Sequence, residues 1–108
     1  MKVINMPNEI GYSSSHPVKK DLIIKEKYKL LTIGVDNGVT IAPCVMESET
    51  LFYVVEGRGE INDYGREGST DYKNTLTIKS GDIIVVPPKT IRSIAAYERM
   101  SLLAVQIH

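Results

Sequence analysis

The regular alternation of short apolar runs with turn residues is the feature that most constrains the fold of this chain. The runs are rich in aliphatic and β-branched side chains, which favour strands, and no window keeps a helical period over three turns. In chain order they are DLIIK, YKLLTIGV, VTIA, LFYVVE, TLTIK, IIVVPP, IRSIAA and MSLLAVQI. The sequence therefore predicts an all-β sandwich or barrel of roughly eight to ten short strands.

The segments between these runs carry residues suited to tight reversals. Residues 36–38, DNG, are typical of a hairpin turn, because Asn and Gly tolerate positive φ. Gly57 and Gly81 flank apolar runs, and we expect them where strands reverse sharply. Pro87 and Pro88 cannot donate a ladder hydrogen bond, so we expect them to end a strand.

Length and N-terminal composition predict one domain preceded by an arm. A chain of 108 residues has the size of a single domain. Residues 7–20, PNEIGYSSSHPVKK, are rich in Pro, Gly and Ser and favour an extended segment over a helix. We therefore expect an N-terminal arm over residues 1–20 and a single barrel domain over residues 21–108.

A polar stretch, NDYGREGSTDYKN, interrupts the apolar runs from Asn62 to Asn74. It contains two glycines, two tyrosines and five charged side chains. This composition predicts a long, mobile hairpin loop. The alternative is a lid or recognition loop over the mouth of a barrel.

The charge balance and the single cysteine exclude several classes of protein. Thirteen basic residues balance thirteen acidic ones, so the chain lacks the basic excess of a nucleic-acid binder. The N-terminus has no long apolar run, which argues against a signal peptide or a membrane span. Cys44 alone allows no intrachain disulfide and fits a reducing compartment. We therefore expect a cytoplasmic protein without a membrane or nucleic-acid partner, and the zero net charge is compatible with oligomers.

Two segments together resemble the conserved motifs of the cupin superfamily, in particular small cupin 2 type barrels. The first is GVTIAPCVMESETLFYVVEG, residues 38–57, and the second is GDIIVVPPKTIRSI, residues 81–94, in which Lys89 stands where the family usually has glycine. The resemblance covers about residues 22–107. It implies a cupin double-stranded β-helix, or jelly-roll barrel, and a homodimer, because members of the family are commonly homodimers.

The same resemblance implies that the usual metal ligands are replaced. The three histidines and the glutamate of metal-binding cupins fall on Cys44, Met46, Arg92 and Thr50. Arg92 cannot bind a cation, because its guanidinium is always protonated and has no acceptor. We therefore expect no metal and no cofactor. Two alternatives remain for Cys44 and Met46: they fill apolar core volume, or they hold a soft ion such as Cu(I).

Arg92 raises a problem of charge burial. If its side chain points inward like the histidine it replaces, an unpaired charge in a small barrel costs several kcal/mol. One solution is an internal partner; Glu47 is a better candidate than Glu49, which should point away from the face of Thr50 by strand alternation. The other solutions are a bound carboxylate or phosphate, or a side chain that extends to water.

Strand alternation also predicts which residues line the hollow. Thr50, Phe52 and Val54 should share the inner face of one strand, while Tyr53 points outward to the second sheet layer or a partner subunit. The candidate ligand-binding set is Cys44, Met46, Thr50, Phe52 and Arg92.

No complete catalytic set is visible in the sequence. His16 lies in the polar leader and His108 ends the chain, so neither is expected to bind a metal, although His16 is a candidate to cover a barrel mouth. Cys44 lacks a nearby histidine base, and no serine lies in a nucleophile elbow.

Three functions remain open. The first is a binding module, or a degenerate enzyme, for a small anionic organic molecule. The second is an isomerase, cyclase or dioxygenase-like enzyme that uses Cys44, Arg92, Tyr53 or the loop from Asn62 to Asn74. The third is a structural dimer with a filled barrel. The state of the cavity discriminates among them.

Overall fold

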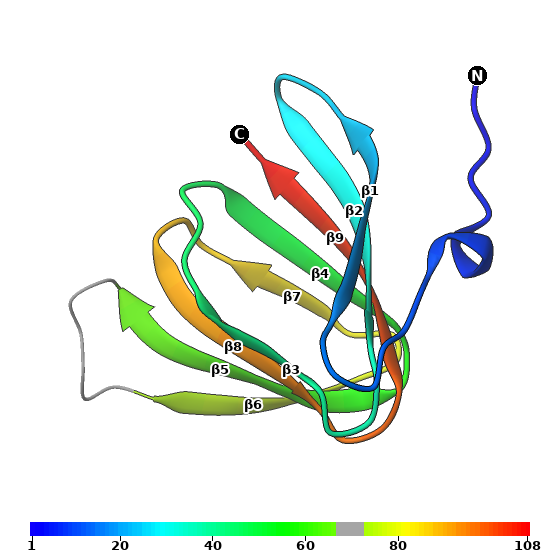
Figure 1. The fold of residues 1–108 in the computed structure, drawn as a ribbon. Helices are drawn as coiled ribbons and strands as arrows, with labels where there is room; N and C mark the ends of the chain where they lie inside the picture. Colours follow the sequence, from blue (N-terminus) through cyan, green and yellow to red (C-terminus); the bar gives the residue numbers. More distant parts are fainter. Residues whose placement is uncertain (67–72) are drawn as a thin grey trace.

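The computed structural model describes residues 1–66 and 73–108, and strands dominate this part of the chain (Figure 1). A single 3-10 helix, η1, precedes nine strands there. The elements are η1 (Met6–Glu9), β1 (Val18–Ile24), β2 (Tyr28–Val35), β3 (Thr40–Cys44), β4 (Glu49–Glu56), β5 (Arg58–Arg66), β6 (Asn74–Lys79), β7 (Ile83–Val86), β8 (Thr90–Ala96) and β9 (Met100–Ile107).

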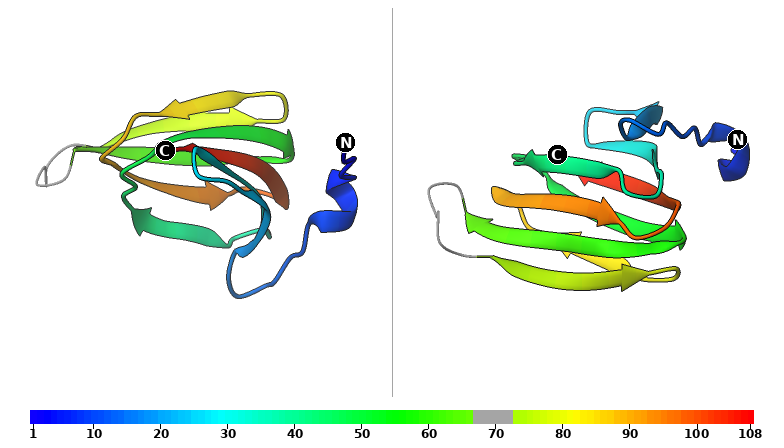
Figure 2. Two further views of the ribbon diagram at one scale, coloured as in Figure 1. Left: turned by 90° about the horizontal axis from the view of Figure 1, so that it is seen from above. Right: turned by 60° about the horizontal axis from the view of Figure 1, so that its bottom comes forward.

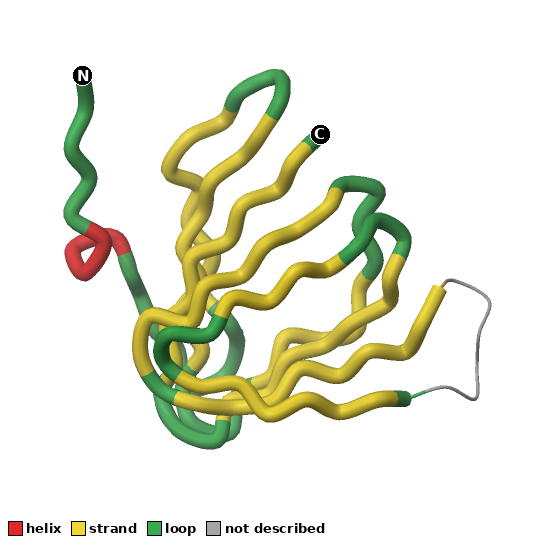
Figure 3. The backbone as a smooth tube through the Cα atoms, turned by 180° about the vertical axis from the view of Figure 1, so that it is seen from behind, coloured by secondary structure: helices red, strands yellow, loops and turns green. Residues whose placement is uncertain are grey.

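The strands form two antiparallel sheets that pack face to face. The larger sheet has the order β1-β2-β9-β4-β7, and the smaller has the order β3-β8-β5-β6. Seen from behind, the two layers meet at the lower end of the molecule and spread apart toward the upper end (Figure 3). The all-β jelly-roll prediction is confirmed.

The core lies between the two sheets and follows the period of two along each strand. Val54 on β4 pairs with Leu102 on β9, and both side chains are fully buried. On the smaller sheet, Ile94 on β8 lies opposite Ile61 on β5 and Ile41 on β3, and all three are buried. Burial of these aliphatic side chains supplies the main stabilisation, at about 1.5–3 kcal/mol for each side chain.

The described part of one predicted loop proves to be mostly strand. Asn62 to Arg66 continue β5, while residues 67–72 of the predicted loop lie outside the described residues, so its lid alternative stays a prediction. The stretch is polar because its outward side chains bond one another across the sheet: Asn62 donates to Ser93 Oγ at 3.2 Å and accepts from Thr75 Oγ1 at 2.7 Å. Tyr64 also lies within 3.2 Å of Ser93 Oγ. These partners satisfy side chains that composition alone assigned to a loop.

The N-terminal arm packs on the outer face of the larger sheet (Figure 2). Thr32 Oγ1 donates to the carbonyl of Glu9 at 2.9 Å. Gly34 permits close approach of the arm, because a Cβ on it would lie 1.9 Å from the carbonyl oxygen of Gly11. β1 already begins at Val18, so the last three residues of the expected arm belong to a strand.

Two turn positions show the backbone angles that the sequence implies. Gly57 has φ +85°, and a Cβ there would lie 2.2 Å from the carbonyl oxygen of Arg99, so glycine is required on both counts. Lys89 has φ +64° at the position where the cupin motif usually has glycine. Its N–H donates to the carbonyl of Met46 at 2.8 Å, which helps to hold this strained conformation.

Candidate ligand-binding site

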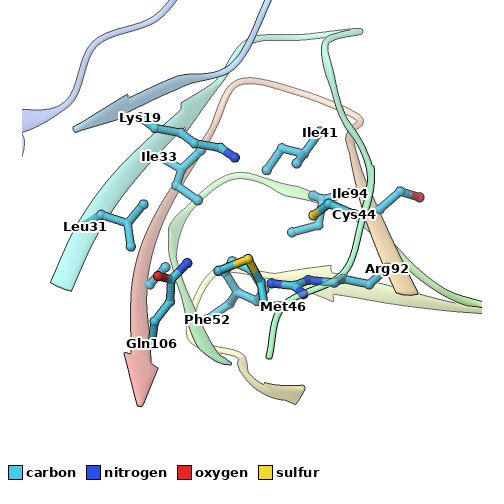
Figure 4. Close-up of a pocket in the computed structure, with 12 residues that line it drawn as sticks. Lys19, Leu31, Ile33, Ile41, Cys44, Met46, Phe52, Arg92, Ile94 and Gln106 are labelled. Atoms are coloured by element: carbon cyan, nitrogen blue, oxygen red, sulfur yellow. The ribbon is translucent and has the colours of Figure 1, made fainter. Parts of the chain in front are cut away.

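A small cavity lies between the two sheets, and we call it the inner hollow (Figure 4). Its volume is about 50 Å³, enough for about four water molecules. The walls are mainly aliphatic. The polar or sulfur-bearing side chains that line it are Lys19, Cys44, Met46, Arg92 and Gln106.

The structure brings four of the five candidate residues to the inner hollow. Cys44, Met46, Phe52 and Arg92 line it, and Thr50 is buried beside it in contact with Arg92. Met46 reaches the hollow from the segment after β3 rather than from a strand, since β3 ends at Cys44.

Arg92 is placed in the hollow by its strand register. It occupies the inner face of β8, opposite Cys44 on β3 and opposite Asp63 on β5. Only 5% of the residue is exposed. In Figure 4 the guanidinium extends from β8 into the hollow toward Met46 and Phe52. A permanent charge is therefore held inside a mainly apolar space.

The contacts of Arg92 compensate its charge only weakly. Nη2 donates to Thr50 Oγ1 at 3.4 Å, beyond the usual range for a strong hydrogen bond. The guanidinium carbon lies 5.9 Å from the centre of the Phe52 ring, at the limit of a cation–π contact. None of the ion pairs within residues 1–66 and 73–108 includes Arg92.

The internal partners expected for Arg92 are not found. Glu47 is exposed in the segment between β3 and β4 and makes no ion pair with Arg92, so the preferred pairing was wrong. Glu49 begins β4, opposite Ile107 and away from the inner face, as alternation predicted. Burial lowers the pKa of Arg92, and the neighbouring Cys44 partly offsets this effect. Within the described residues, the buried charge of Arg92 therefore has no carboxylate partner, and its burial stays unfavourable.

Lys19 is a second cation at the hollow that sequence reasoning missed. It was assigned to the arm, but it lies on β1 opposite Ile33, which points into the core. Figure 4 shows its ammonium group directed into the same space from the side opposite Arg92. Gln106 on β9, which also lines the hollow, was missed as well.

A second cavity, of about 60 Å³, lies between the edges of β6 and β7 and is also lined by Arg92. Asp63 and Thr90 supply its other polar side chains. Asp63 Oδ1 accepts the N–H of Gly65 at 2.7 Å, so this carboxylate is bound to its own turn. The sequence did not identify Asp63 because it lies in the stretch predicted as a loop.

The donor set does not fit a divalent metal. Among the described residues, no group of three His, Cys, Asp or Glu side chains lies close enough to hold an ion. His16 donates from Nδ1 to the carbonyl of Pro17 at 3.0 Å, and Nδ1 of His108 lies 2.8 Å from Ser48 Oγ. Both histidines are exposed, and neither lines the hollow. The guanidinium of Arg92 beside Cys44 would repel a cation at that place.

The alternation predicted for β4 is confirmed. Thr50, Phe52 and Val54 are buried on the inner face, whereas Tyr53 is 41% exposed on the outer face. Tyr53 therefore lies outside the inner hollow, so an enzyme acting there would have to use one of the other groups named for that alternative.

Solved structures with the same architecture define the class of fold. No protein-family model and no curated protein matches the sequence. A Klebsiella pneumoniae protein with a double-stranded β-helix domain matches 99% of this chain and 90% of its own, with TM-score 0.84 and 15% identity. A cupin superfamily protein from Desulfitobacterium hafniense covers 84% and 76%, with TM-score 0.72 and 16% identity. A cupin 2 conserved barrel domain protein from Leptotrichia buccalis covers 97% and 47%, with TM-score 0.80 and 19% identity.

The chain therefore has the cupin fold, as the two sequence motifs indicated. At these identities the likeness establishes the architecture and leaves the ligand to be argued from the hollow itself. In the described part of the chain, no helix has the length and apolar character needed to cross a bilayer.

Proposed function

We propose that this cupin-fold chain is a binding module for a small organic anion, which Arg92 holds in the inner hollow. The observation that carries the proposal is the buried guanidinium, which has five N–H donors and one long side-chain hydrogen bond within the described residues. A carboxylate accepts two parallel N–H bonds from a guanidinium and neutralises its charge. A bound carboxylate would therefore supply the compensation that neither Glu47 nor Glu49 provides.

The volume of the inner hollow limits the size of the ligand that can bind there. A volume of about 50 Å³ is far below the 300–1,000 Å³ of typical drug-sized sites. It suits a carboxylate of about two or three carbons, such as acetate or lactate. The aliphatic walls favour a short hydrocarbon part, and Lys19 opposite Arg92 adds a second positive charge that attracts anions.

The open hollow favours this function over a purely structural barrel, since a filled barrel would leave no such space. The proposal requires no divalent metal, and no group of three His, Cys, Asp or Glu side chains among the described residues could hold one. It also retains the cytoplasmic location expected from the sequence.

Isothermal titration calorimetry with sodium acetate and sodium lactate tests the proposal. For a ligand of this size we expect a dissociation constant on the order of 1 mM. Arg92→Met should weaken binding roughly 10- to 150-fold, because it removes charge-assisted hydrogen bonds worth about 1.5–3 kcal/mol.

Two controls make this experiment specific. Arg58→Met causes the same change in net charge at an exposed side chain far along the chain from Arg92 and should leave binding unchanged. Acetamide, which matches acetate in shape without its charge, should not bind. Equal binding by wild type and Arg92→Met would refute the proposal.

A further inference from the structure

The second cavity carries two opposite charges that do not compensate each other. It lies between β6 and β7, which are edge strands of the two sheets, and both Arg92 and Asp63 line it. These two residues are direct partners in the pairing of β8 with β5. Within residues 1–66 and 73–108 they nevertheless form no ion pair with each other. The cavity therefore presents a cationic group and an anionic group side by side to a ligand.

The position of Asp63 is set by an irregularity in β5. The pairing register of β5 with β8 shifts between Asp63 and Arg66, and Gly65 in this interval has a φ of +80°. Such bulges redirect side chains and are frequent beside functional sites. The N–H of Gly65 donates to Asp63 Oδ1 at 2.7 Å and holds the carboxylate in place. A carboxylate has about four acceptor positions, so Asp63 keeps the capacity to accept further hydrogen bonds in the cavity.

The second cavity opens to solvent and has the size of a very small molecule. Leu76 and Val85 line it and are 48% and 59% exposed, so a ligand can enter between β6 and β7. The volume of about 60 Å³ holds about five water molecules and therefore a ligand of about five or six heavy atoms. The rest of the wall is mainly apolar, formed by Ile61, Ile84, Val86 and Pro87.

We propose that the second cavity binds a small α-amino acid in its zwitterionic form. The guanidinium of Arg92 donates two parallel N–H bonds to the α-carboxylate. The carboxylate of Asp63 accepts N–H bonds from the α-ammonium group. Side chains at directly paired strand positions begin about 5 Å apart, which suits two ligand groups that are joined through a single carbon atom. The apolar wall then contacts a side chain of about the size of a methyl group.

The charges around Arg92 also explain why a zwitterion should prefer the second cavity to the inner hollow. Arg92 lines both spaces. In the inner hollow the other charged group is Lys19, which attracts an anion and repels an ammonium group. In the second cavity it is Asp63, which attracts the ammonium group. The inference goes beyond the proposed function, because it concerns a different cavity and a different class of ligand, and each proposal can fail without the other.

A nuclear magnetic resonance titration of the full chain with L-alanine tests the inference. The backbone N–H signals of Gly65 and Thr90 report on the second cavity, since Gly65 bonds Asp63 and Thr90 lines the wall. In the wild type they should shift saturably, with a dissociation constant on the order of 1 mM. Sodium propionate has the shape of alanine without its ammonium group and should leave both signals in place. Asp63→Asn should weaken alanine binding roughly 10- to 150-fold, because it removes the charge that holds the ammonium group.

The matched control is Asp21→Asn, which makes the same substitution on β1 in the other sheet. Asp21 pairs there with Lys29 at 3.0 Å, and the variant should bind alanine as the wild type does. The comparison of alanine with propionate uses the wild type alone, so it stays decisive even if a variant fails to fold.

Acetate binding separates this inference from the proposed function. Asp63→Asn should still bind acetate in the inner hollow, because Asp63 does not line that space. A wild type that binds acetate, while alanine leaves the Gly65 and Thr90 signals unchanged, would overturn the inference and leave the proposed function standing. Equal alanine binding by the wild type and Asp63→Asn, or equal shifts with alanine and propionate, would overturn it as well.

Discussion

Replacing Arg92 with methionine should make the ligand-free protein more stable while removing its anion binding. The magnitude follows from the contacts of the side chain. The hydrogen bond to Thr50 at 3.4 Å and the Phe52 ring at 5.9 Å contribute at most about 1 kcal/mol each. Burying an unpaired charge costs several kcal/mol, and this cost is reduced here because the guanidinium reaches the cavity. We therefore expect Arg92→Met to raise the free energy of unfolding by about 1–2 kcal/mol.

Urea denaturation without added anion measures this change directly. The melting temperature should rise in parallel, by about 4–8 °C for each kcal/mol in a domain of this size. Arg58→Met is the control: its side chain is 64% exposed, and the free energy of unfolding should change by less than about 0.5 kcal/mol. A loss of 1 kcal/mol or more in Arg92→Met, with an unchanged denaturant slope, would show that the charge is already compensated in the ligand-free protein and would refute the reasoning.

Three further predictions concern the turns and a surface ion pair. Lys89→Gly should raise the free energy of unfolding by about 0.5–1 kcal/mol, because it relieves a positive φ of 64°; a destabilised variant in thermal denaturation would contradict this. Gly57→Ala should cost at least about 2 kcal/mol more than Gly38→Ala, since both have positive φ but only Gly57 would place a Cβ 2.2 Å from the Arg99 carbonyl oxygen; equal losses in urea denaturation would exclude that clash. The hydrogen bonds from Arg99 at 3.3 Å, and then the N–H of the next residue, lower the pKa of Asp36 below its ordinary value of 3.8. The stabilisation is therefore complete above that value and is lost as pH falls through the lower folded pKa, so Asp36→Asn should flatten the acid limb of a pH–stability profile; an unchanged limb would show that the pair contributes nothing.

The architecture was predictable because its signals are local. Apolar runs and turn residues sufficed for most strands, and Gly57 indeed takes the positive φ expected of it. β5 was missing from the predicted strands, because its outward residues are polar and more than half of it fell in the predicted loop. Their compensation comes from Ser93 and Thr75 on neighbouring strands, which the local pattern does not reveal.

The site was predictable only where strand alternation determines it. Alternation along β4 correctly placed Phe52 inward and Tyr53 outward. Lys19 was missed because β1 begins at Val18, inside the segment assigned to the arm, and Asp63 was missed because it lies in the stretch predicted as a loop. In addition, the pairing register of β1 shifts between Asp21 and Ile23. Strict alternation of inward and outward side chains along β1 would therefore not have shown that Lys19 points inward.

The most direct test of the central claim is a nuclear magnetic resonance titration that follows the side-chain Nε–H signal of Arg92. If a small anion binds the guanidinium in the inner hollow, this signal should shift saturably with sodium acetate and stay in place with acetamide. The signals of the exposed Arg58 should not move. An Arg92 signal that is unchanged by acetate, or that shifts only in proportion to ionic strength, would contradict the account.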